Sequence, residues 1–575
     1  MEDLSEYFKP ETSSIQSFFL TQIGTGFAVP VYQRPYSWDN DKITKLVSDI
    51  SHGYASLADN PKSATYLGAV ITVTQSGNEI FGTKRTLPGN ILSVIDGQQR
   101  ISTLLLLISA LHERISELFS QLNFKGSDEE LRQTVSQLTN STKKELRDIL
   151  GLRFPYYNPR PCFPFYPRLI RAYTDKWEPV NLLYRSPIAM FLKKYDDHVE
   201  NLENNPPSSS EEYAFDIDSL KPTSPDQEDN FNKVKTAYKH LRKLLKVFEK
   251  TIGTNKNDTL NKEEIEALDV EALINQKSIQ ERLFRDGFES SVRDSLLKGT
   301  PQAKISSKLL QFIGLASYLK SRVALTKVET KADEYAFEIF EALNATGEPL
   351  TAIETFKPQV YQGKDPDSIK ASDAYRWMEQ IERNLGAEAT KDKNKRTNEV
   401  LTSFALATAG VKLLSRLNDQ RQFLKLYDSL SIPVKDTFVH DLCYLTDFYK
   451  HLWWNENKGE VRTYCRDLSD KDIDLLQLCF HFLCELKHSI TVSTLFHFYR
   501  QVRLNPTHEA QREFLEAVKA CAAFSTIWRG AKGSTDKIDS IYRSFCKDGY
   551  KKDDGTVLLE PLALLDKNLS YRGPS

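Results

Sequence analysis

The amino-acid sequence predicts an α+β protein, in which a small α/β domain at the N-terminus precedes a mainly α-helical region. Short runs rich in β-branched and aromatic residues, which are typical of strands, are concentrated before residue 100. A long apolar helical pattern begins at Gln98, and Leu, Phe and Lys recur at helical spacing through the C-terminal third. We therefore expect an α/β domain over 15–125, a helical extension over 126–365 and a C-terminal helical domain over 366–575.

The composition limits the class of protein. The 575 residues are 40% hydrophobic, and 76 Lys and Arg oppose 78 Asp and Glu to give a formal net charge of -2. A protein that coats nucleic acid with its whole surface would be strongly basic, so any nucleic-acid contact has to come from a local patch. The sequence has no apolar run of about 18 residues, no signal-peptide pattern and no Cys-x-x-Cys pair among its seven cysteines. These features predict a reduced, cytoplasmic protein without a membrane span.

The first region is expected to alternate strands and helices. Phe27–Tyr32 is predicted as a strand, and Pro30 predicts that it lies at a sheet edge because proline donates no ladder hydrogen bond. Asp39 has the position of an N-cap for the helix that follows. The remaining elements expected here are two strands and a long helix, at Tyr66–Val73, Ile91–Ile95 and Gln98–Leu122.

The segment 205–229 is predicted as a linker. It contains Pro206, Pro207, Pro222 and Pro225, and it has seven acidic residues against one Lys. Such a composition is typical of a segment that does not join a packed core.

Asp96-Gly97-Gln98-Gln99-Arg100 stands where a predicted strand passes into a predicted helix. The N–H groups of a helix N-terminus and the helix dipole favour an anion at such a place. Gly97 allows close backbone approach, Arg100 supplies donors suited to phosphate, and Asp96 is suited to holding a metal or orienting a water. An Asp-Gly turn with a surface Arg–Asp salt bridge is the alternative, and it has about equal weight.

Val29–Trp38 combines aromatic residues, an amide and an arginine. Aromatic faces together with Gln33 and Arg34 suit stacking on and hydrogen bonding to a base. Alternatively, the aromatic residues fix the strand to the next helix, an interpretation that we favour for Trp38. For Gln33 and Arg34 the two interpretations are equally weighted.

A third cluster follows a helical pattern at Phe337–Leu343. Thr351 and Glu354 have the spacing of a capping box that opens a new helix. Asn344 and Lys357 are candidates for reaching a phosphate or a catalytic residue, although a helix–turn–helix corner explains most of the pattern.

Arg153–Arg171 is a candidate basic patch, with four Arg, six aromatic residues, five Pro and no acid. Arginines interleaved with aromatic residues suit a nucleic-acid groove, and the candidates for this contact are Arg160, Arg168 and Arg171. The alternative, which has more weight, is a Pro-rich segment that packs its aromatic residues on the domain and leaves Arg at its rim.

These clusters occur in an order that resembles a known family. The residues that carry the resemblance are Phe27-x-Val29-Pro30-x-Tyr32-Gln33-Arg34-x-Tyr36-Ser37-Trp38, Tyr66-Leu67-Gly68, Asp96-Gly97-Gln98-Gln99-Arg100-x-x-Thr103-Leu104, and Phe340-x-x-Leu343-Asn344-x-x-Gly347-x-Pro349-Leu350-Thr351 with Lys357. The sequence is similar to the N-terminal, GmrS-type domain of the GmrSD family of modification-dependent (type IV) restriction enzymes. The similarity extends over about residues 15–360 and is looser over 123–330.

The resemblance implies a ParB/sulfiredoxin-like fold for 15–125 and a site for a nucleoside triphosphate with Mg²⁺. Asp96 would hold the metal or a water, Arg100 and Arg34 would clamp the phosphates, and Gln99 would act with Asp96 and Arg100 in catalysis. The implied nucleotide-binding residues are Arg34, Gly97, Gln98, Gln33, Asn344 and Lys357. The DNA-contact candidates are Tyr32, Arg160, Arg168 and Arg171.

The family further implies that hydrolysis of the nucleotide controls cleavage of modified phage DNA. Glu354 replaces the Asp that the family more often has, which keeps the carboxylate. Full GmrSD-type enzymes end in an HNH-type nuclease module, and this sequence has no convincing His-x-x-Pro followed by paired Asn. The sequence therefore predicts an NTP-hydrolysing sensor of foreign DNA. It leaves open a non-catalytic sensing or scaffold subunit with a separate nuclease chain, and a ParB-like clamp that uses nucleotide only as a switch.

Overall fold

The computed structural model describes residues 9–20, 24–30, 33–74, 88–123, 129–153, 156–157, 161–162, 164–172, 174–177, 183–207, 209–253, 263–330, 351–361, 371–386, 390–454, 461–535, 537–551 and 557–559. The chain forms two compact units, Met1–Phe340 and Glu341–Ser575. The expected domain 15–125 lies inside the first unit. The expected extension 126–365 crosses the boundary between the units.

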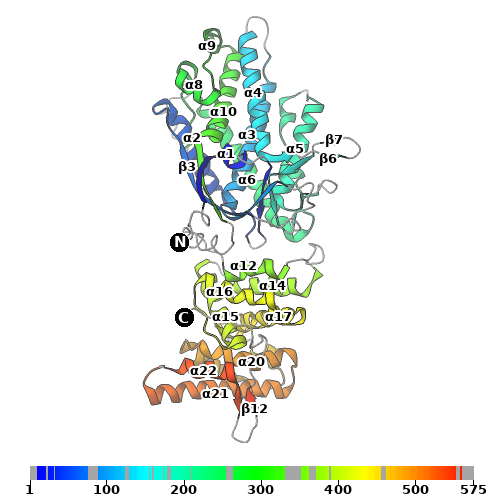
Figure 1. Ribbon diagram of the computed structural model, residues 1–575, viewed down its shortest axis with the longest axis vertical. Coiled ribbons are helices and arrows are strands. Elements are labelled where there is room, and N and C mark those ends of the chain that lie inside the picture. Colours follow the sequence, from blue (N-terminus) through cyan, green and yellow to red (C-terminus); the bar gives the residue numbers. More distant parts are fainter. Residues whose placement is uncertain are drawn as a thin grey trace, which may run out of the picture. The chain divides into compact units, whose positions relative to one another are not determined.

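A six-stranded sheet forms the base of the first unit (Figure 1). Its strands, in spatial order, are β1 (Lys9–Ser14), β10 (Val323–Thr330), β3 (Thr65–Thr74), β4 (Asn90–Asp96), β2 (Thr25–Val29) and β9 (Leu169–Arg171). The β1–β10 and β3–β4 pairs are antiparallel, whereas β10–β3, β4–β2 and β2–β9 are parallel. The sheet is therefore mixed, and it joins strands from both ends of this unit.

Helices of the first unit gather on one side of the sheet, as α3, α4, α6 and α10 show in Figure 1. The helices are α1 (Ile15–Leu20), α2 (Asn40–Ala55), α3 (Gln98–Ser120), α4 (Glu129–Leu150), α5 (Pro187–Asn204), α6 (Glu228–Thr251), α7 (Val270–Asn275), α8 (Lys277–Phe284), α9 (Ser290–Leu297) and α10 (Pro301–Arg322). Short strands and 3₁₀ turns complete the unit: η2 (Ser56–Ala58), β5 (Gly151–Arg153), β6 (Tyr156–Tyr157), β7 (Pro161–Cys162), β8 (Phe165–Pro167), η3 (Ser210–Tyr213), η4 (Ile217–Ser219) and η5 (Pro225–Gln227).

Local sequence signals explain the elements nearest the site. The Asp39 side chain accepts a hydrogen bond from the Lys42 N–H at 2.9 Å and so caps α2 as expected. Helix α3 is buried over most of its length because it packs against α4, α6 and α10, which fits the all-round apolar stretch 104–108. One core of buried residues runs from Ile15 to Leu325, so the segment 15–125 shares its core with the helices that follow it.

The edge position predicted for the strand at Phe27–Tyr32 is wrong. Strand β2 pairs with β4 on one side and β9 on the other, so it lies one strand inside the edge. Pro30 stands just after the last residue of β2, Val29, where it interrupts no ladder hydrogen bond. The proline therefore ends the strand and does not define an edge.

The linker predicted over 205–229 is also wrong, because the structure packs this segment onto α3 and α6. Phe215, Ile217 and Leu220 are 4%, 2% and 0% exposed. The Phe215 N–H donates to the Glu113 carboxylate at 2.9 Å, and Arg242 donates to the same carboxylate at 2.7 and 2.6 Å. Three buried apolar side chains and a hydrogen-bonded buried acid outweigh the polar, proline-rich composition.

Substitution of Leu220 by Ala should therefore destabilise the first unit by about 2–5 kcal/mol, because it empties space in a buried core. The neighbouring Lys221 is exposed, and Lys221→Ala should change the free energy of unfolding by no more than about 0.5 kcal/mol. Chemical denaturation of both variants would measure these changes. Equal, small effects of the two substitutions would contradict the packed arrangement.

The second unit is mainly helical where it is described, and it contains one antiparallel pair of short strands. Its helices are α12 (Ala352–Tyr361), α14 (Asp373–Leu385), α15 (Thr390–Ala409), α16 (Leu417–Leu424), α17 (Ile432–Phe448), α18 (Val461–Tyr464), α19 (Asp470–Glu485), α20 (Ile490–Leu504), α21 (His508–Lys532) and α22 (Ile538–Asp548). The shorter elements are η6 (Lys425–Ser429), the π-helical turn η7 (Tyr449–Trp453), and the paired strands β11 (Tyr550–Lys551) and β12 (Val557–Leu559). A small N-terminal sheet followed by a mainly helical remainder confirms the predicted α+β class.

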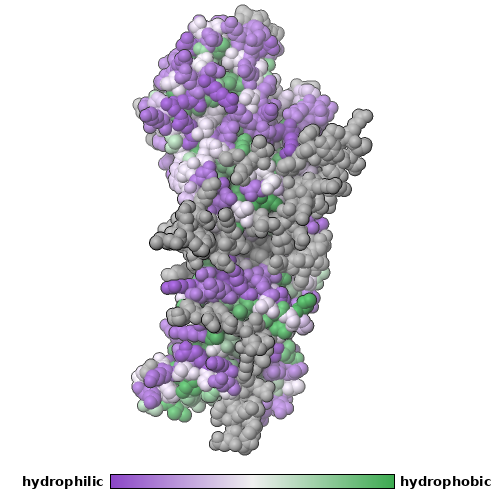
Figure 2. Space-filling model, in the orientation of Figure 1, coloured by the Kyte–Doolittle hydropathy of each residue, from purple (hydrophilic) through white to green (hydrophobic). Residues whose placement is uncertain are grey.

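Within the described ranges, no helix has both the length and the apolar character needed to cross a membrane. Where the surface of the first unit is coloured in Figure 2, hydrophilic residues cover much of the visible face.

Candidate functional site

The centre of the candidate site is the turn between strand β4 and helix α3. Asp96 is the last residue of β4, where it lies opposite Ile71 of β3, and α3 begins two residues later at Gln98. Gly97 between them has φ of 92°, and a Cβ there would lie 2.8 Å from Val70 Cγ2. Only glycine fits this turn without strain, and the turn brings the Asp96 carboxyl to the positive end of a 23-residue helix.

Gln98 and Gln33 join the first two sequence clusters. The Gln98 side-chain amide donates to Gln33 Oε1 at 3.0 Å and to the Arg34 carbonyl at 2.8 Å. Gln33 in turn donates to the carbonyl of Ile95, one residue before Asp96. Both glutamines are buried, with 7% and 6% exposure, so these hydrogen bonds are shielded from water. Buried hydrogen bonds therefore join the two clusters, which are about 60 residues apart in sequence.

Gln99 and Tyr36 extend this set of hydrogen bonds along α3. Gln99 donates to the Pro35 carbonyl at 3.1 Å and accepts from the Ser37 N–H at 2.8 Å. The Tyr36 hydroxyl is 2.8 Å from Thr103 Oγ1, and burial raises the pKa of Tyr36 to about 12. The segment 33–37 is thus fixed to the first two turns of α3, and Tyr36 is held as a neutral phenol.

The charged groups at the turn are one acid and two arginines. Burial raises the pKa of the Asp96 carboxyl, against the opposing effects of the Gly97 N–H and of the positive charges on Arg100 and Arg34. Burial also lowers the pKa of the Arg100 guanidinium, which the Asp96 charge opposes. Arg100 Nη1 donates to the Ala69 carbonyl at 2.8 Å, which fixes Arg100 against β3, whereas Arg34 is exposed.

A known family matches the part of the chain that contains this turn. The model of the N-terminal domain of the GmrSD restriction endonuclease matches residues 15–361. The chain belongs to the GmrSD restriction endonuclease family. No curated protein matches it. Membership in the GmrSD family indicates a role in a restriction system, and with it an interaction with DNA.

Within the GmrSD domain, the four predicted DNA-contact residues have different surroundings. Arg171 donates to the Gln33 carbonyl and so lies beside the joined clusters. Arg168 is only 3% exposed, and its guanidinium donates to four backbone carbonyls, which favours a structural role. Tyr32 and Arg160 lie outside the described residues. DNA contact by any of the four stays a prediction.

The third cluster of the GmrSD domain belongs to the second compact unit where it is described. Glu354 accepts from the Thr351 N–H at 2.7 Å, and its own N–H donates to Thr351 Oγ1 at 3.3 Å, so the predicted capping box is present. Lys357 of α12 donates to Glu379 at 2.9 Å and to Glu382 at 2.7 Å on α14. Asn344 lies outside the described residues, and the contribution of Asn344 and Lys357 to a nucleotide site stays a prediction.

The donor set at the turn is compatible with Mg²⁺ delivered with a nucleotide. Magnesium is commonly bound by one or two carboxylates together with substrate phosphates, and Asp96 supplies one carboxylate. Among the described residues, no group of three or more His, Cys, Asp and Glu could hold a metal by itself. A metal at this turn would therefore depend on ligand oxygens as well as on Asp96.

Sequence reasoning found the charged residues of the site but missed their supports. The Ala69 carbonyl that anchors Arg100 is a backbone group, and it leaves no trace in residue type. Thr103 was visible only as part of the family pattern. Its position four residues after Gln99 places both side chains on the face of α3 that contacts 35–37.

Proposed function

We propose that this chain binds and hydrolyses a nucleoside triphosphate and thereby senses foreign, modified DNA in a prokaryotic anti-phage restriction system. The observation that supports the proposal is the grouping of Asp96, Arg100 and Arg34 at the N-terminus of α3. Phosphate is favoured by the helix dipole and by arginine, while a carboxylate is needed to bind a metal or to orient a water. The turn offers all three within one strand–helix junction.

The residues would divide the chemistry between them. Arg34 is exposed and would meet the phosphates first, whereas the partly buried Arg100, fixed by the Ala69 carbonyl, would give a preorganised positive charge. Asp96 would orient the attacking water, and Gln98 and Gln99 would hold the segment 33–37 in place around the nucleotide. A bound Mg²⁺ would supply neutralisation of phosphate charge.

The test is a turnover assay with four nucleoside triphosphates, with and without modified and unmodified DNA. Replacement of Arg34 by Ala should lower turnover by about 100-fold, because it removes one positive charge from the phosphates. Arg34 is exposed, so the melting temperature should change little. Lys45→Ala, at a 75% exposed side chain on α2, is the matched control and should keep full turnover. Absence of turnover and of nucleotide binding in the wild-type chain would overturn the proposal.

A second candidate is a non-catalytic DNA-sensing or scaffold subunit, with the nuclease on another chain. It is favoured by the engagement of the Gln98 and Gln99 amides in holding the segment 33–37. In this case the junction residues would be structural, and Asp96→Ala would leave DNA binding intact in a protein without nucleotide turnover. Binding of modified DNA by a chain that neither binds nor hydrolyses nucleotide would support this candidate.

A further inference from the structure

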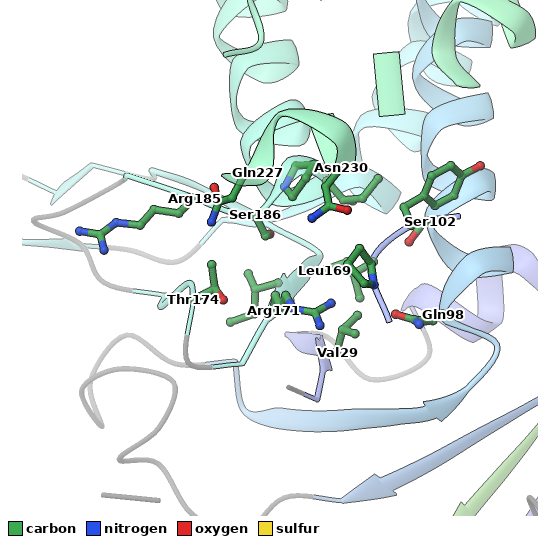
Figure 3. Close-up of a pocket in the computed structure, with 15 residues that line it drawn as sticks. Val29, Gln98, Ser102, Leu169, Arg171, Thr174, Arg185, Ser186, Gln227 and Asn230 are labelled. Atoms are coloured by element: carbon green, nitrogen blue, oxygen red, sulfur yellow. The ribbon is translucent and has the colours of Figure 1, made fainter. Parts of the chain in front are cut away.

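A small pocket lies beside the nucleotide-site candidate in the first unit, and Figure 3 shows it in close-up. Its volume is about 130 Å³. The ends of strands β2 and β9 form its floor, and the first turns of α3, α5 and α6 form its walls. We call it the amide pocket, defined by five of its polar residues, Gln98, Ser102, Arg171, Gln227 and Asn230.

The amide pocket has a positive character. Its described lining includes Arg171 and Arg185 and no acidic residue. Three helices of 23, 18 and 24 residues begin at it, and helix dipoles place partial positive charge at their N-termini. A ligand with electron-rich oxygen or nitrogen atoms is therefore favoured over a cation.

One polar atom of the amide pocket lacks a partner, and other polar side chains lie close to it. Gln227 Oε1 is buried without a hydrogen bond. Ser102, which is 5% exposed, and the half-buried Asn230 place a hydroxyl and an amide in the same lining. In Figure 3 the Ser102, Asn230 and Gln98 side chains point toward the same space. A buried polar atom without a partner is costly, so Gln227 Oε1 and the polar side chains that converge beside it point to a ligand that would hydrogen-bond to them.

The remaining lining defines the shape of the ligand. Val29, Leu169, Ile170 and Ile188 give the pocket apolar surfaces, and Tyr36 adds an aromatic side chain. A flat heterocycle with apolar faces and hydrogen-bonding edges matches this combination, since Asn and Gln side chains each offer a donor and an acceptor. The volume of about 130 Å³ is of the order of a single base.

We propose that the amide pocket binds one nucleobase, either extruded from DNA or carried by a free nucleotide. Enzymes and sensors that read a base outside the duplex hold it in such a pocket, through hydrogen bonds to its edge and contacts with its faces. The DNA form of this proposal rests on the proposed function, and it assigns DNA recognition to a place next to the NTP site.

Gln98 connects the two sites. It lines the amide pocket, and the same side chain donates to Gln33 and to the Arg34 carbonyl beside Asp96. Arg171, which also lines the pocket, donates to the Gln33 carbonyl. A base that contacts Gln98 or Arg171 therefore acts on the residues that position Arg34, so binding of the base changes nucleotide turnover.

The experiment compares Asn230→Leu with Asn232→Leu, because both residues lie on α6 and only Asn230 faces the pocket, whereas Asn232 is exposed. The probes are AMP, CMP, GMP and TMP in calorimetric titrations, and a DNA duplex with pyrrolocytosine, whose fluorescence rises when the base leaves the stack. Asn230→Leu should weaken base binding at least tenfold and remove the effect of DNA on nucleotide turnover. Asn232→Leu should leave both unchanged, and basal turnover should persist in both variants.

Two arms distinguish the source of the base. Asn230-dependent binding of a monophosphate assigns the pocket to free nucleotides, whereas an Asn230-dependent fluorescence rise with the duplex assigns it to an extruded base. Ser102→Ala, which removes only a hydroxyl, gives the same comparison if Asn230→Leu folds poorly. If the wild-type protein hydrolyses nucleotide but shows neither response, base binding by the pocket is overturned and the proposed hydrolysis stands. Base binding without any turnover overturns the proposed hydrolysis and leaves the pocket standing.

Discussion

Replacement of Asp96 by Asn is expected to lower nucleotide turnover at least 100-fold and, at pH 7, to raise the melting temperature. The loss of turnover follows because the amide can neither hold a metal as a carboxylate does nor orient a water as a base. The gain in stability follows because burial raises the pKa of this carboxyl. Ionisation of Asp96 therefore costs more in the folded than in the unfolded state, and at pH 7 the amide avoids this cost.

The effect of Asp96→Asn on stability should depend on pH. A raised pKa means that the folded state holds the Asp96 proton more tightly than the unfolded state does, so the free energy of unfolding falls as pH rises through the window between the two pKa values. The advantage of Asp96→Asn should thus be complete above the folded-state pKa and should vanish below the ordinary value of about 4. Thermal denaturation of the wild type and of Asp96→Asn between pH 4 and pH 8 measures this difference in stability.

The matched control is Asp41→Asn, at an exposed residue of α2, which should change turnover and melting temperature little. Retention of full turnover by Asp96→Asn would remove Asp96 from the chemistry. A lower melting temperature at pH 7 would show that the ionised carboxylate stabilises the fold through Arg100 and Arg34, contrary to the burial argument.

Elements specified by local signals could be predicted from the sequence. The helix capped by Asp39, the strand that ends at Asp96 and the long buried helix after Gly97 all have residue patterns that act within a few positions. The position of β2 inside the sheet could not be predicted in this way. It depends on β9, whose residues follow β2 by about 140 positions.

The segment 205–229 shows why composition alone was insufficient. Its average character is polar and acidic, yet Phe215, Ile217 and Leu220 meet a core provided by other helices. Glu113 on α3, a buried acid that accepts from the Phe215 N–H, could not be recognised as its partner from spacing. Three well-placed apolar side chains decide burial, and an average over 25 residues conceals them.

The candidate site was predictable in its chemistry but not in its geometry. Asp96, Arg100, Gln33 and Arg34 stand out by residue type, and the structure brings their clusters together through Gln98. The amide pocket was not foreseen, because Ser102, Gln227 and Asn230 are ordinary polar residues of helix N-termini until their convergence is seen. Composition also cannot show which arginine of the segment 153–171 is buried, as Arg168 is.

Replacement of Arg168 by Met is expected to destabilise the first unit by about 3–5 kcal/mol. Its guanidinium donates to the carbonyls of Ile149 at 3.1 Å, Thr25 at 2.9 Å and Gly151 at 2.9 Å, and also to that of Asp148. These groups belong to the end of α4 and to the neighbouring strands. Arg168 therefore satisfies the last carbonyls of a 22-residue helix and ties that helix to β2.

The cost is large because methionine leaves those carbonyls buried without donors. Burial lowers the pKa of Arg168 to about 10, which still leaves the side chain charged at neutral pH, so the charge-assisted bonds persist under physiological conditions. Arg168→Lys keeps the charge but lacks the planar set of donors, and it should recover only part of the stability. Denaturant titration of both variants measures the difference.

Arg132→Met is the control, since this α4 side chain is 50% exposed and forms a surface ion pair with Glu129, and its effect should stay within about 0.5 kcal/mol. A DNA-binding measurement separates the two roles considered for Arg168, contact with phosphate and support of α4. If Arg168 contacts phosphate, Arg168→Met should weaken binding to all sequences and reduce the salt dependence by about one counterion while the melting temperature stays constant. A large fall in melting temperature, with DNA affinity retained in the folded fraction, identifies Arg168 as the residue that fixes α4 to the sheet, and leaves the predicted DNA contact to the other candidates.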